Sequence, residues 1–425
     1  MSKTLRLPYS NSISKSAAVP STRSPQIGCP VPTVVTKAED LSRNVFGLLG
    51  LALDAVDFST LLQSMEVAAG NALPFLISTP NVNFLVTSQR NGEFRESVLL
   101  SDLCLADGMP LIWIAKLLKI PINERIAGSD LFGRLKSTNN IVRRLRVFLL
   151  GGADGVAATV CEKLNAQRGG LECVGVLNPG FGTIEEMSTT QIIDKINASR
   201  PDLLAVFFGA EKAQQWLIHN HHHLHPPIRA QFGATINFEA GTVKRAPRFL
   251  RSTGFEWLWR IKEEPHLWRR YWNDGKVLFQ LLATSVLPLI IAARRTRGKA
   301  DDLSIYSNED LTSVTLCLSG AAVALNVDKA IHHFRNALST GKQITIDVLK
   351  TQSIDPRFFG LFLMVRKQLA SQGKELTFTG VSPGVRRIFR LNRFEFLLPP
   401  SNVIPGGHKG RLFFLRSAVD SAYQS

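Results

Sequence analysis

Short apolar runs alternate with helix-length amphipathic segments from residue 45 to about residue 240, and this alternation restricts the chain to few folds. Each run is bounded by turn residues, as expected of a buried strand. Strands that alternate with helices predict a parallel sheet covered on both faces. The predicted strands are 73–78, 103–106, 144–150, 171–176, 203–208 and 230–236, with helices at 111–118, 155–166, 189–198 and 213–219.

Polar residues and glycines directly follow three of these runs: Thr79 and Asn81, then Asp107, then Gly151 with Gly152. In open parallel sheets ligands bind beyond the carboxyl ends of the strands, so we expect these residues along one edge. A carboxylate there can act as a general base. The pair Asp-Gly is also common in turns, an asparagine can simply cap the next helix, and two glycines also suit a tight strand-to-helix turn.

A basic, tryptophan-rich segment follows at 241–276. Aromatic rings beside arginine and lysine suit a membrane headgroup interface, and the same cations suit a diphosphate. The next run, 277–293, is apolar but interrupted by polar residues and a proline; as a helix of about 26 Å it is expected to lie in an interface or on protein rather than span a core of about 30 Å. The tryptophans and basic residues of the segment 241–276 are Trp257, Trp259, Trp268, Trp272, Lys244, Arg245, Arg248, Arg251, Arg260, Lys262, Arg269, Arg270 and Lys276.

The charge and cysteine content limit the partners and the compartment. A net charge of +16 predicts an anionic partner. No helix-turn-helix, zinc-finger or RNA-binding motif accompanies it, so nucleic acid is not expected. The five cysteines show no paired or Cys-x-x-Cys spacing, which predicts reduced thiols in the cytosol. Residues 1–44 lack the apolar core of a secretory signal and are interpreted as a disordered tail.

A smaller α/β unit is predicted at 303–400, after a basic linker at 294–302 and before a tail at 401–425. Its strands are predicted at 314–318, 343–348 and 376–379, and its helices at 327–337, 359–369 and 383–390. The core at 45–240 and the basic appendage at 241–293 complete the expected organisation.

Residues 45–271 resemble the TagA/WecG/CpsF family of bacterial glycosyltransferases. The resemblance implies a Rossmann-like core with a basic helical appendage. It also implies inverting transfer of a hexose or N-acetylhexosamine from a UDP-sugar to a polyprenyl-diphosphate-linked saccharide in cell-surface polysaccharide synthesis. The enzyme would be cytoplasmic, peripheral at the inner face of the plasma membrane, and without metal or cofactor. The matching motifs are Thr79-Pro80-Asn81, Ala106-Asp107-Gly108, Glu124-Arg125, Gly128-Ser129-Asp130-Leu131, Gly151-Gly152, Gly241 to Pro247, Glu256 to Arg260, Glu264-Pro265 and Arg269-Arg270-Tyr271.

The same resemblance assigns roles to individual residues. Asp107 is the expected general base. The chain has no Asp-x-Asp for a divalent metal, so arginines are expected to meet the charge of the leaving diphosphate. The expected substrate-binding residues are Thr79, Asn81, Arg125, Gly151, Gly152, Gln214, Lys244, Arg245, Arg260, Arg269 and Arg270.

Two departures from the family pattern leave an alternative open. The usual Gly-x-Pro-x-Gln-Glu-x-Trp run has Glu211, Ala213 and Gln214 in place of its proline, glutamine and acid, and the usual Phe-Asp-Phe carries Asn237. Both changes are expected near the donor pocket. A non-catalytic nucleotide-sugar-binding or regulatory protein is therefore the alternative to an active enzyme.

The unit at 303–400 resembles a STAS domain, on Ile346-Asp347-Val348, Ile354-Asp355 and the run from Gly373 to Pro383. Pro356 stands where such domains phosphorylate a hydroxyl, so a docking or regulatory module without a phospho-switch is predicted, with a protein as its partner. A histidine-rich loop at 219–225 is interpreted as a solvated loop rather than a zinc site, because consecutive histidines cannot all converge on one ion.

Overall fold

The structure is a computed structural model that describes residues 41–138, 143–167, 169–295 and 302–400 of the chain. Most of the expected tails, 1–44 and 401–425, and most of the expected linker, 294–302, lie outside the described residues.

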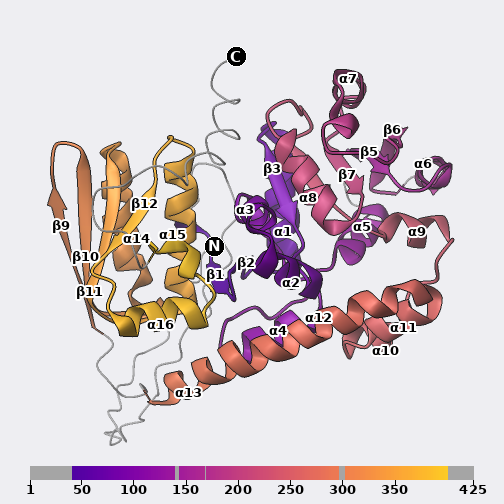
Figure 1. Cartoon of the computed structure of the whole chain (residues 1–425). Helices are drawn as coiled ribbons and strands as arrows, with labels where there is room; N and C mark the ends of the chain where they lie inside the picture. The colour runs from indigo at the N-terminus through magenta and orange to yellow at the C-terminus, as the bar shows by residue number, and fades with distance from the viewer. Residues whose placement is uncertain (1–40, 139–142, 168, 296–301, 401–425) are drawn as a thin grey trace, which may run out of the picture. The chain divides into compact units, whose positions relative to one another are not determined.

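Six parallel strands form the central sheet, in the order β4-β3-β8-β7-β5-β6. Figure 1 labels four of them, β3, β7, β5 and β6, which follow one another in this order. The predicted Rossmann-like parallel sheet is confirmed. Strands β3, β4, β7 and β8 are buried along their whole length and β5 along its last five residues, which explains why these segments are largely apolar in the sequence, whereas the edge strand β6 is only partly buried. The strands are β3 (Phe75–Ser78), β4 (Leu103–Cys104), β5 (Leu145–Gly151), β6 (Leu171–Leu177), β7 (Leu203–Phe207) and β8 (Ile228–Gln231).

The predicted strand at 230–236 was wrong from residue 232 onward. Strand β8 ends at Gln231, and Gly233 takes a positive φ of 50° in the turn that follows. Helix α9 (Thr235–Ala240) then begins, and Gly241 ends it in the left-handed conformation. The glycines on both sides permit these reversals, which a side chain would oppose.

Helices connect the strands of the sheet. Several begin with a side-chain cap: Asp57 accepts from the Thr60 amide at the start of α1, and Asn81 accepts from the Phe84 amide at the start of α2. Helix α1 (Phe58–Gly70) precedes the first strand of the sheet, and the connecting helices are α2 (Val82–Arg90), α3 (Gly92–Leu99), α4 (Met109–Leu117), α5 (Gly128–Ser137), α6 (Val156–Gln167), η2 (Glu186–Ser188), α7 (Thr190–Ala198) and α8 (Ala210–His219).

The basic segment after the sheet is helical, as predicted. It forms α10 (Arg248–Ser252), α11 (Glu256–Glu263), η3 (Pro265–Leu267), α12 (Trp268–Leu281), a π-helical segment η4 (Leu282–Val286) and α13 (Leu287–Arg295). Figure 1 shows α12 and α13 as one continuous helix. The π-helical turn lies just before Pro288, where a missing N–H and the proline ring disturb the regular hydrogen bonds.

Length and composition alone would let one described helix, Pro265–Arg294, cross a membrane. From the sequence, the apolar run 277–293 was expected to be too short to span a membrane. The structure joins this run to the polar residues before it in one longer helix. Only 17% of its most apolar 18-residue window is buried by protein; the other residues are partly or fully exposed.

The C-terminal domain, residues 302–400, contains a four-stranded sheet in the order β12-β11-β10-β9. Strands β10, β11 and β12 are parallel, and β9, which was not predicted, pairs antiparallel with β10. The elements are β9 (Leu303–Glu309), β10 (Ser313–Ala322), η5 (Ala324–Asn326), α14 (Val327–Ser339), β11 (Gln343–Ile354), α15 (Pro356–Ala370), β12 (Leu376–Thr379), α16 (Pro383–Leu391) and η6 (Glu395–Leu397).

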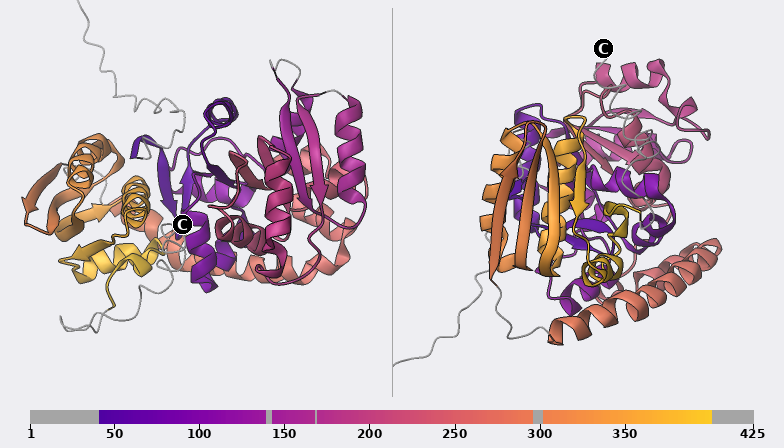
Figure 2. Two further views of the ribbon diagram at one scale, coloured as in Figure 1. Left: turned by 90° about the horizontal axis from the view of Figure 1, so that it is seen from above. Right: turned by 60° about the vertical axis from the view of Figure 1, so that its left-hand side comes forward.

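A hairpin of β1 (Val45–Leu48) and β2 (Leu51–Asp54) lies between the C-terminal domain and the central sheet (Figures 1 and 2). Its two-residue turn places Leu49 and Gly50 at positive φ. Helix α15 packs on the hairpin so closely that a Cβ on Gly360 would lie 2.0 Å from the Val45 carbonyl oxygen. Buried residues of the hairpin, of α3 and of the C-terminal domain belong to one hydrophobic core.

Candidate active site

A cavity of about 1630 Å³ opens at the carboxyl ends of the central strands. The turns after β3, β4, β5, β7 and β8 all contribute to its lining, as does the helical segment α10 to α12. This position agrees with the expectation for an open parallel sheet. Eight of the expected site residues line the cavity: Thr79, Asn81, Asp107, Arg125, Gly151, Gly152, Arg260 and Arg270.

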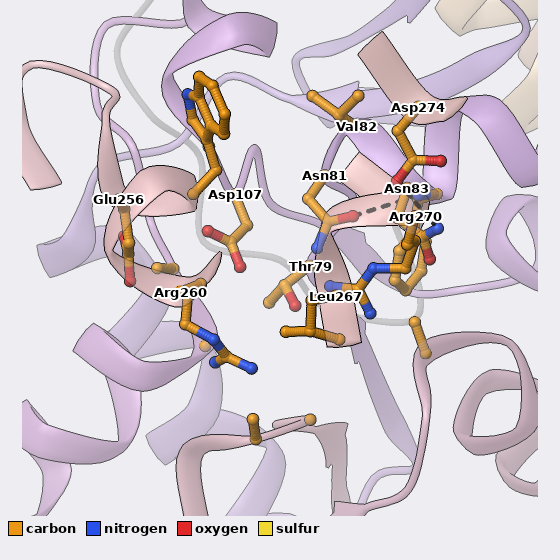
Figure 3. Close-up of a pocket in the computed structure, with 18 of the residues that line it drawn as sticks. Thr79, Asn81, Val82, Asn83, Asp107, Glu256, Arg260, Leu267, Arg270 and Asp274 are labelled. Atoms are coloured by element: carbon orange, nitrogen blue, oxygen red, sulfur yellow. Dashed lines mark hydrogen bonds between the residues drawn. The ribbon is translucent and has the colours of Figure 1, made fainter. Parts of the chain in front are cut away.

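Asp107 is held at this cavity by its own backbone and by a helix start. Its amide donates to the Pro80 carbonyl at 2.8 Å, and Gly108 follows at a φ of 115°. The carboxylate accepts from the amide of Gly128, the first residue of α5, and lies 3.8 Å from an Arg125 Nη1. In Figure 3 the carboxylate points into the same space as Thr79 and Arg260.

The environment of Asp107 raises its pKa to about 7. Burial is the largest cause, and the negative charges of Glu256 and Asp130 act in the same direction. Arg125 and the Gly128 amide oppose the shift and lower the pKa. A carboxylate with a pKa near neutrality is a stronger base than an ordinary aspartate, and about half of it is ionised near pH 7.

Thr79 and Asn81 offer hydrogen-bond donors beside Asp107. The Thr79 hydroxyl accepts from the Gln231 side-chain amide at 2.9 Å, so its own proton is available to another group. Asn81 does cap α2, through Oδ1 at 3.1 Å from the Phe84 amide nitrogen. The cap uses only the oxygen, so the side-chain nitrogen of Asn81 is available to a ligand.

A cluster of three arginines surrounds Asp130. Arg125 binds it at 2.6 Å, Arg245 at 2.5 Å and Arg251 at 3.0 Å. Arg125 also lies 3.3 Å from Glu256. Because these guanidinium groups are already paired with carboxylates, they fix the walls of the cavity and the electrostatic environment of Asp107.

Two other arginines reach into the cavity from the helical segment. Arg260 is bound to Glu264 at 2.6 Å and lies over the Phe238 ring. Arg270, on α12, lies over the Tyr271 ring at 5.0 Å. Figure 3 shows Arg260 and Arg270 facing the space between themselves and Thr79. Planar guanidinium groups at this position suit the oxygens of a phosphate.

Gly151 and Gly152 have φ values of 100° and 88°, which side chains rarely adopt. A Cβ on Gly151 would lie 2.7 Å from the Phe208 ring, and one on Gly152 would lie 3.1 Å from Ile236. Backbone conformation and packing therefore explain both glycines. Their peptide groups also line the cavity, so contact with a ligand is compatible with this structural role.

Four of the expected substrate-binding residues lie outside the lining of the cavity. Gln214 is fully buried and hydrogen-bonded to Ser78 and Ser101. Arg245 lies one layer back, on Asp130. The other two are exposed: Lys244, whose carbonyl accepts from the Trp259 indole, and Arg269, whose guanidinium lies 5.7 Å from the centre of the Trp268 ring.

The two departures from the family pattern have different surroundings. Ala213 and Gln214 are both fully buried, so neither contacts the cavity. Asn237 does line it. Of these three residues, Asn237 alone lines the cavity.

Sequence reasoning missed an apolar rim around the cavity mouth. Its members are exposed aromatic residues from α4 and from the helical segment. The sequence indicated a membrane interface only for the tryptophans of the helical segment, and gave no sign of Trp113, Phe255 or Phe279. Trp272 is 61% exposed and Phe279 75% exposed. The rim consists of Trp113, Phe255, Trp257, Trp268, Trp272 and Phe279.

Cysteines and histidines do not form a metal cluster within the described part of the chain. Cys161 and Cys173 form a disulfide, which corrects the expectation of reduced thiols for this pair, while Cys104 and Cys317 are free thiols. Helix α6 packs on β6 and brings the two Cα atoms to 5.2 Å, a proximity that sequence spacing does not reveal. In the histidine-rich loop His222, His223 and His225 are exposed, as expected of a solvated loop.

Comparison with known proteins relates both parts of the chain to families. Residues 46–289 match the profile of the "Glycosyl transferase WecG/TagA/CpsF family", and residues 307–399 match that of the "Mlab, STAS domain". A protein of Bacillus spizizenii (strain ATCC 23059 / NRRL B-14472 / W23), named N-acetylglucosaminyldiphosphoundecaprenol N-acetyl-beta-D-mannosaminyltransferase, is 30% identical over 236 residues, which is 54% of this chain and 88% of that protein. A protein of the same name from Bacillus subtilis (strain 168) is 26% identical over 208 residues, 49% of this chain and 78% of that protein.

Proposed function

This chain belongs to the WecG/TagA/CpsF family of glycosyl transferases, and we propose that it moves an N-acetylhexosamine or hexose from a UDP-sugar to a polyprenyl-diphosphate-linked saccharide, with inversion. The chain is a glycosyltransferase by family. The names of the two Bacillus relatives favour N-acetylmannosamine as the sugar and N-acetylglucosaminyl-diphosphoundecaprenol as the acceptor.

The observation that carries the proposal is the position of Asp107 at the cavity, together with its raised pKa. Inverting transfer requires that a base remove the proton of the acceptor hydroxyl as it attacks the anomeric carbon. Asp107 faces the cavity and has a pKa of about 7, while Arg125 beside it keeps an ionised fraction at neutral pH. We assign it as the general base, with Thr79 and Asn81 orienting a sugar or phosphate.

We assign the leaving diphosphate to Arg260 and Arg270. Negative charge grows on the departing UDP, and fixed cations lower the energy of that state. Of the arginines in the family motifs, these two line the cavity without sharing the Asp130 cluster. The turn at Gly151 and Gly152, which also lines the cavity, would offer its backbone N–H groups to the same ligand. On this assignment cations of the chain itself replace a divalent metal.

The apolar rim suits an acceptor anchored in lipid. Trp268 and Trp272 are exposed, and a lysine or arginine lies against each ring, at 5.3 Å for Lys276 over Trp272. Such pairs place the ring in apolar matter and the charge among headgroups. We therefore propose peripheral attachment to an anionic cytoplasmic membrane surface through α11 to α13, with the polyprenyl chain entering along the rim.

Nucleotide release across a panel of UDP-sugars, with a short-chain polyprenyl-diphosphate N-acetylglucosamine as acceptor, tests the proposal. We expect one donor to release UDP only when the acceptor is present, and mass spectrometry to show one added sugar. Asp107→Asn lowers this turnover about 10²- to 10⁴-fold, whereas Asp194→Asn, at an exposed carboxylate on α7, leaves it unchanged. Saturable UDP-sugar binding without turnover for every donor would instead support the non-catalytic alternative.

A further inference from the structure

We propose that Lys367, in the C-terminal domain, is a positioning residue for the transferase site. The inference rests on the proposed function, because the group that it positions is the strand leading to Asp107. Lys367 lies on α15, and its ammonium group donates to the Asp102 carboxylate at 2.8 Å and to the Ser101 carbonyl at 3.0 Å. Both acceptors belong to the central-sheet part of the chain.

Strand β4 needs such support because it is short and lies at the edge of the sheet. It contains two residues, and only Leu103 and Cys104 pair with β3. Asp102 extends this pairing: its amide donates to the Leu76 carbonyl, and its carboxylate accepts from the Leu76 amide, both at 2.8 Å. Asp102 therefore fixes β4 against β3 at the end opposite the cavity.

The charge of Lys367 keeps Asp102 ionised for this task. Burial raises the pKa of Asp102, but the Lys367 charge and the Leu76 amide outweigh burial, and the net shift is downward. Without Lys367 the carboxylate would lose its principal counter-charge. A largely buried carboxylate that loses its counter-charge takes up a proton or moves toward water. Either change would weaken the hydrogen bond that Asp102 accepts from the Leu76 amide.

A buried hydrogen-bond network connects Ser101, which Lys367 contacts, to Ser78 at the end of β3 beside the cavity. The Ser101 hydroxyl bonds to that of Ser78 at 2.6 Å, and both contact the Gln214 side chain, at 3.0 and 2.7 Å. Ser78 is the residue before Thr79 and accepts from the Leu105 amide at 2.8 Å. Lys367 thus restrains Ser101, and the network restrains the two turns that present Thr79 and Asp107.

The outer edge of β4 also depends on the C-terminal domain. The Cys104 amide donates to Asp54 of β2 at 2.7 Å, and Asp54 is in turn bound by Arg43 at 2.7 Å. The hairpin that carries Asp54 packs on α15, where the carbonyl of Val45 accepts from Arg357 at 3.2 Å. Strand β4 is therefore held between β3 and elements anchored on α15, so its position depends on both parts of the protein.

Steady-state kinetics of the full-length protein test the role of Lys367. Displacement of a catalytic group by about 1 Å costs on the order of 100-fold in rate. We expect Lys367→Met to lower kcat about 10- to 100-fold, with KM for the UDP-sugar changed less than threefold, and Lys367→Arg to recover most of the loss. The control is Arg366→Met, which breaks the neighbouring ion pair of α15 with Glu96 at 2.7 Å but does not touch β4.

Amide hydrogen exchange provides a readout that does not need turnover. In Lys367→Met the amides of Leu76, Leu105 and Asp107 exchange faster than in the wild type, while those of β5 and β7 are unchanged. Should Lys367→Met be too unstable to purify, Asp102→Asn breaks the same ion pair from the other side. If the wild type itself transfers no sugar, the proposed function fails, and the exchange of these three amides still decides whether Lys367 holds β4.

Wild-type kcat in Lys367→Met would overturn the inference. Equal losses in Lys367→Met and Arg366→Met would also overturn it, since the effect would then be one of domain docking. Unchanged exchange at Leu76 and Asp107 would do the same, because the strand would then not depend on Lys367.

Discussion

Replacing Asp107 with asparagine is expected to remove activity and to raise stability at alkaline pH. General-base catalysis contributes about 10²- to 10⁴-fold, so kcat should fall by that factor. In the wild type kcat/KM should fall tenfold per pH unit below about 7, because the base is then protonated. The residual activity of Asp107→Asn should show no such dependence.

The effect on stability follows from the direction of the shift. The pKa of Asp107 rises from 3.8 to about 7 on folding, so the native state holds this proton more tightly than the unfolded state. The stability that Asp107 contributes is present in full below pH 3.8 and is lost as the pH rises through 7. The shift corresponds to about 4 kcal/mol at most. Solvent reaches the side chain, which is 24% exposed, so we expect about 1 to 2 kcal/mol.

Denaturant unfolding of both proteins at pH 5 and pH 8 measures this difference. Asp107→Asn should be more stable than the wild type at pH 8, and the gain should shrink toward pH 4. Transfer assays over the same pH range complete the test. The reasoning is refuted if the wild-type rate is independent of pH between 5 and 8, or if Asp107→Asn retains wild-type turnover.

Three further changes test other parts of the structure. Arg125→Met removes the cation beside Asp107, so the acidic limb of the pH–rate profile should move to higher pH; an unmoved limb would exclude this role. Trp268→Ser combined with Trp272→Ser should weaken binding to vesicles of anionic phospholipid on the order of 1000-fold, since each ring contributes on the order of 2 kcal/mol when half inserted, and sedimentation with vesicles measures it. Cys173→Ser opens the disulfide and should cost about 3 kcal/mol of unfolding free energy in the absence of reductant; equal stability of variant and wild type would show that the bond does not form in solution.

The sheet and its ligand-binding edge could be predicted from the sequence because buried parallel strands leave continuous apolar runs. Strands β5, β6 and β7 begin and end within a residue or two of prediction. The rule that ligands lie at the carboxyl ends of such strands then placed Asp107 and Thr79 together. The run at 230–236 misled because a short apolar segment has no periodicity that separates strand from helix.

Motif positions could not distinguish residues that face the cavity from residues one layer behind it. Arg245 and Gln214 stand in family motifs, yet one holds Asp130 and the other bonds to Ser78. The support that α15 gives to β4 was invisible for a similar reason. Nothing in the spacing of Lys367 and Asp102 indicates that residues 265 positions apart form an ion pair.

A structure of Asp107→Asn with a UDP-sugar and a short-chain lipid acceptor would test the assigned chemistry most directly. We expect the attacking hydroxyl of the acceptor within about 3 Å of the residue 107 side chain, and the diphosphate beside Arg260 and Arg270. An acceptor hydroxyl directed away from residue 107, with the diphosphate bound far from both arginines, would contradict the assignment of base and cations alike.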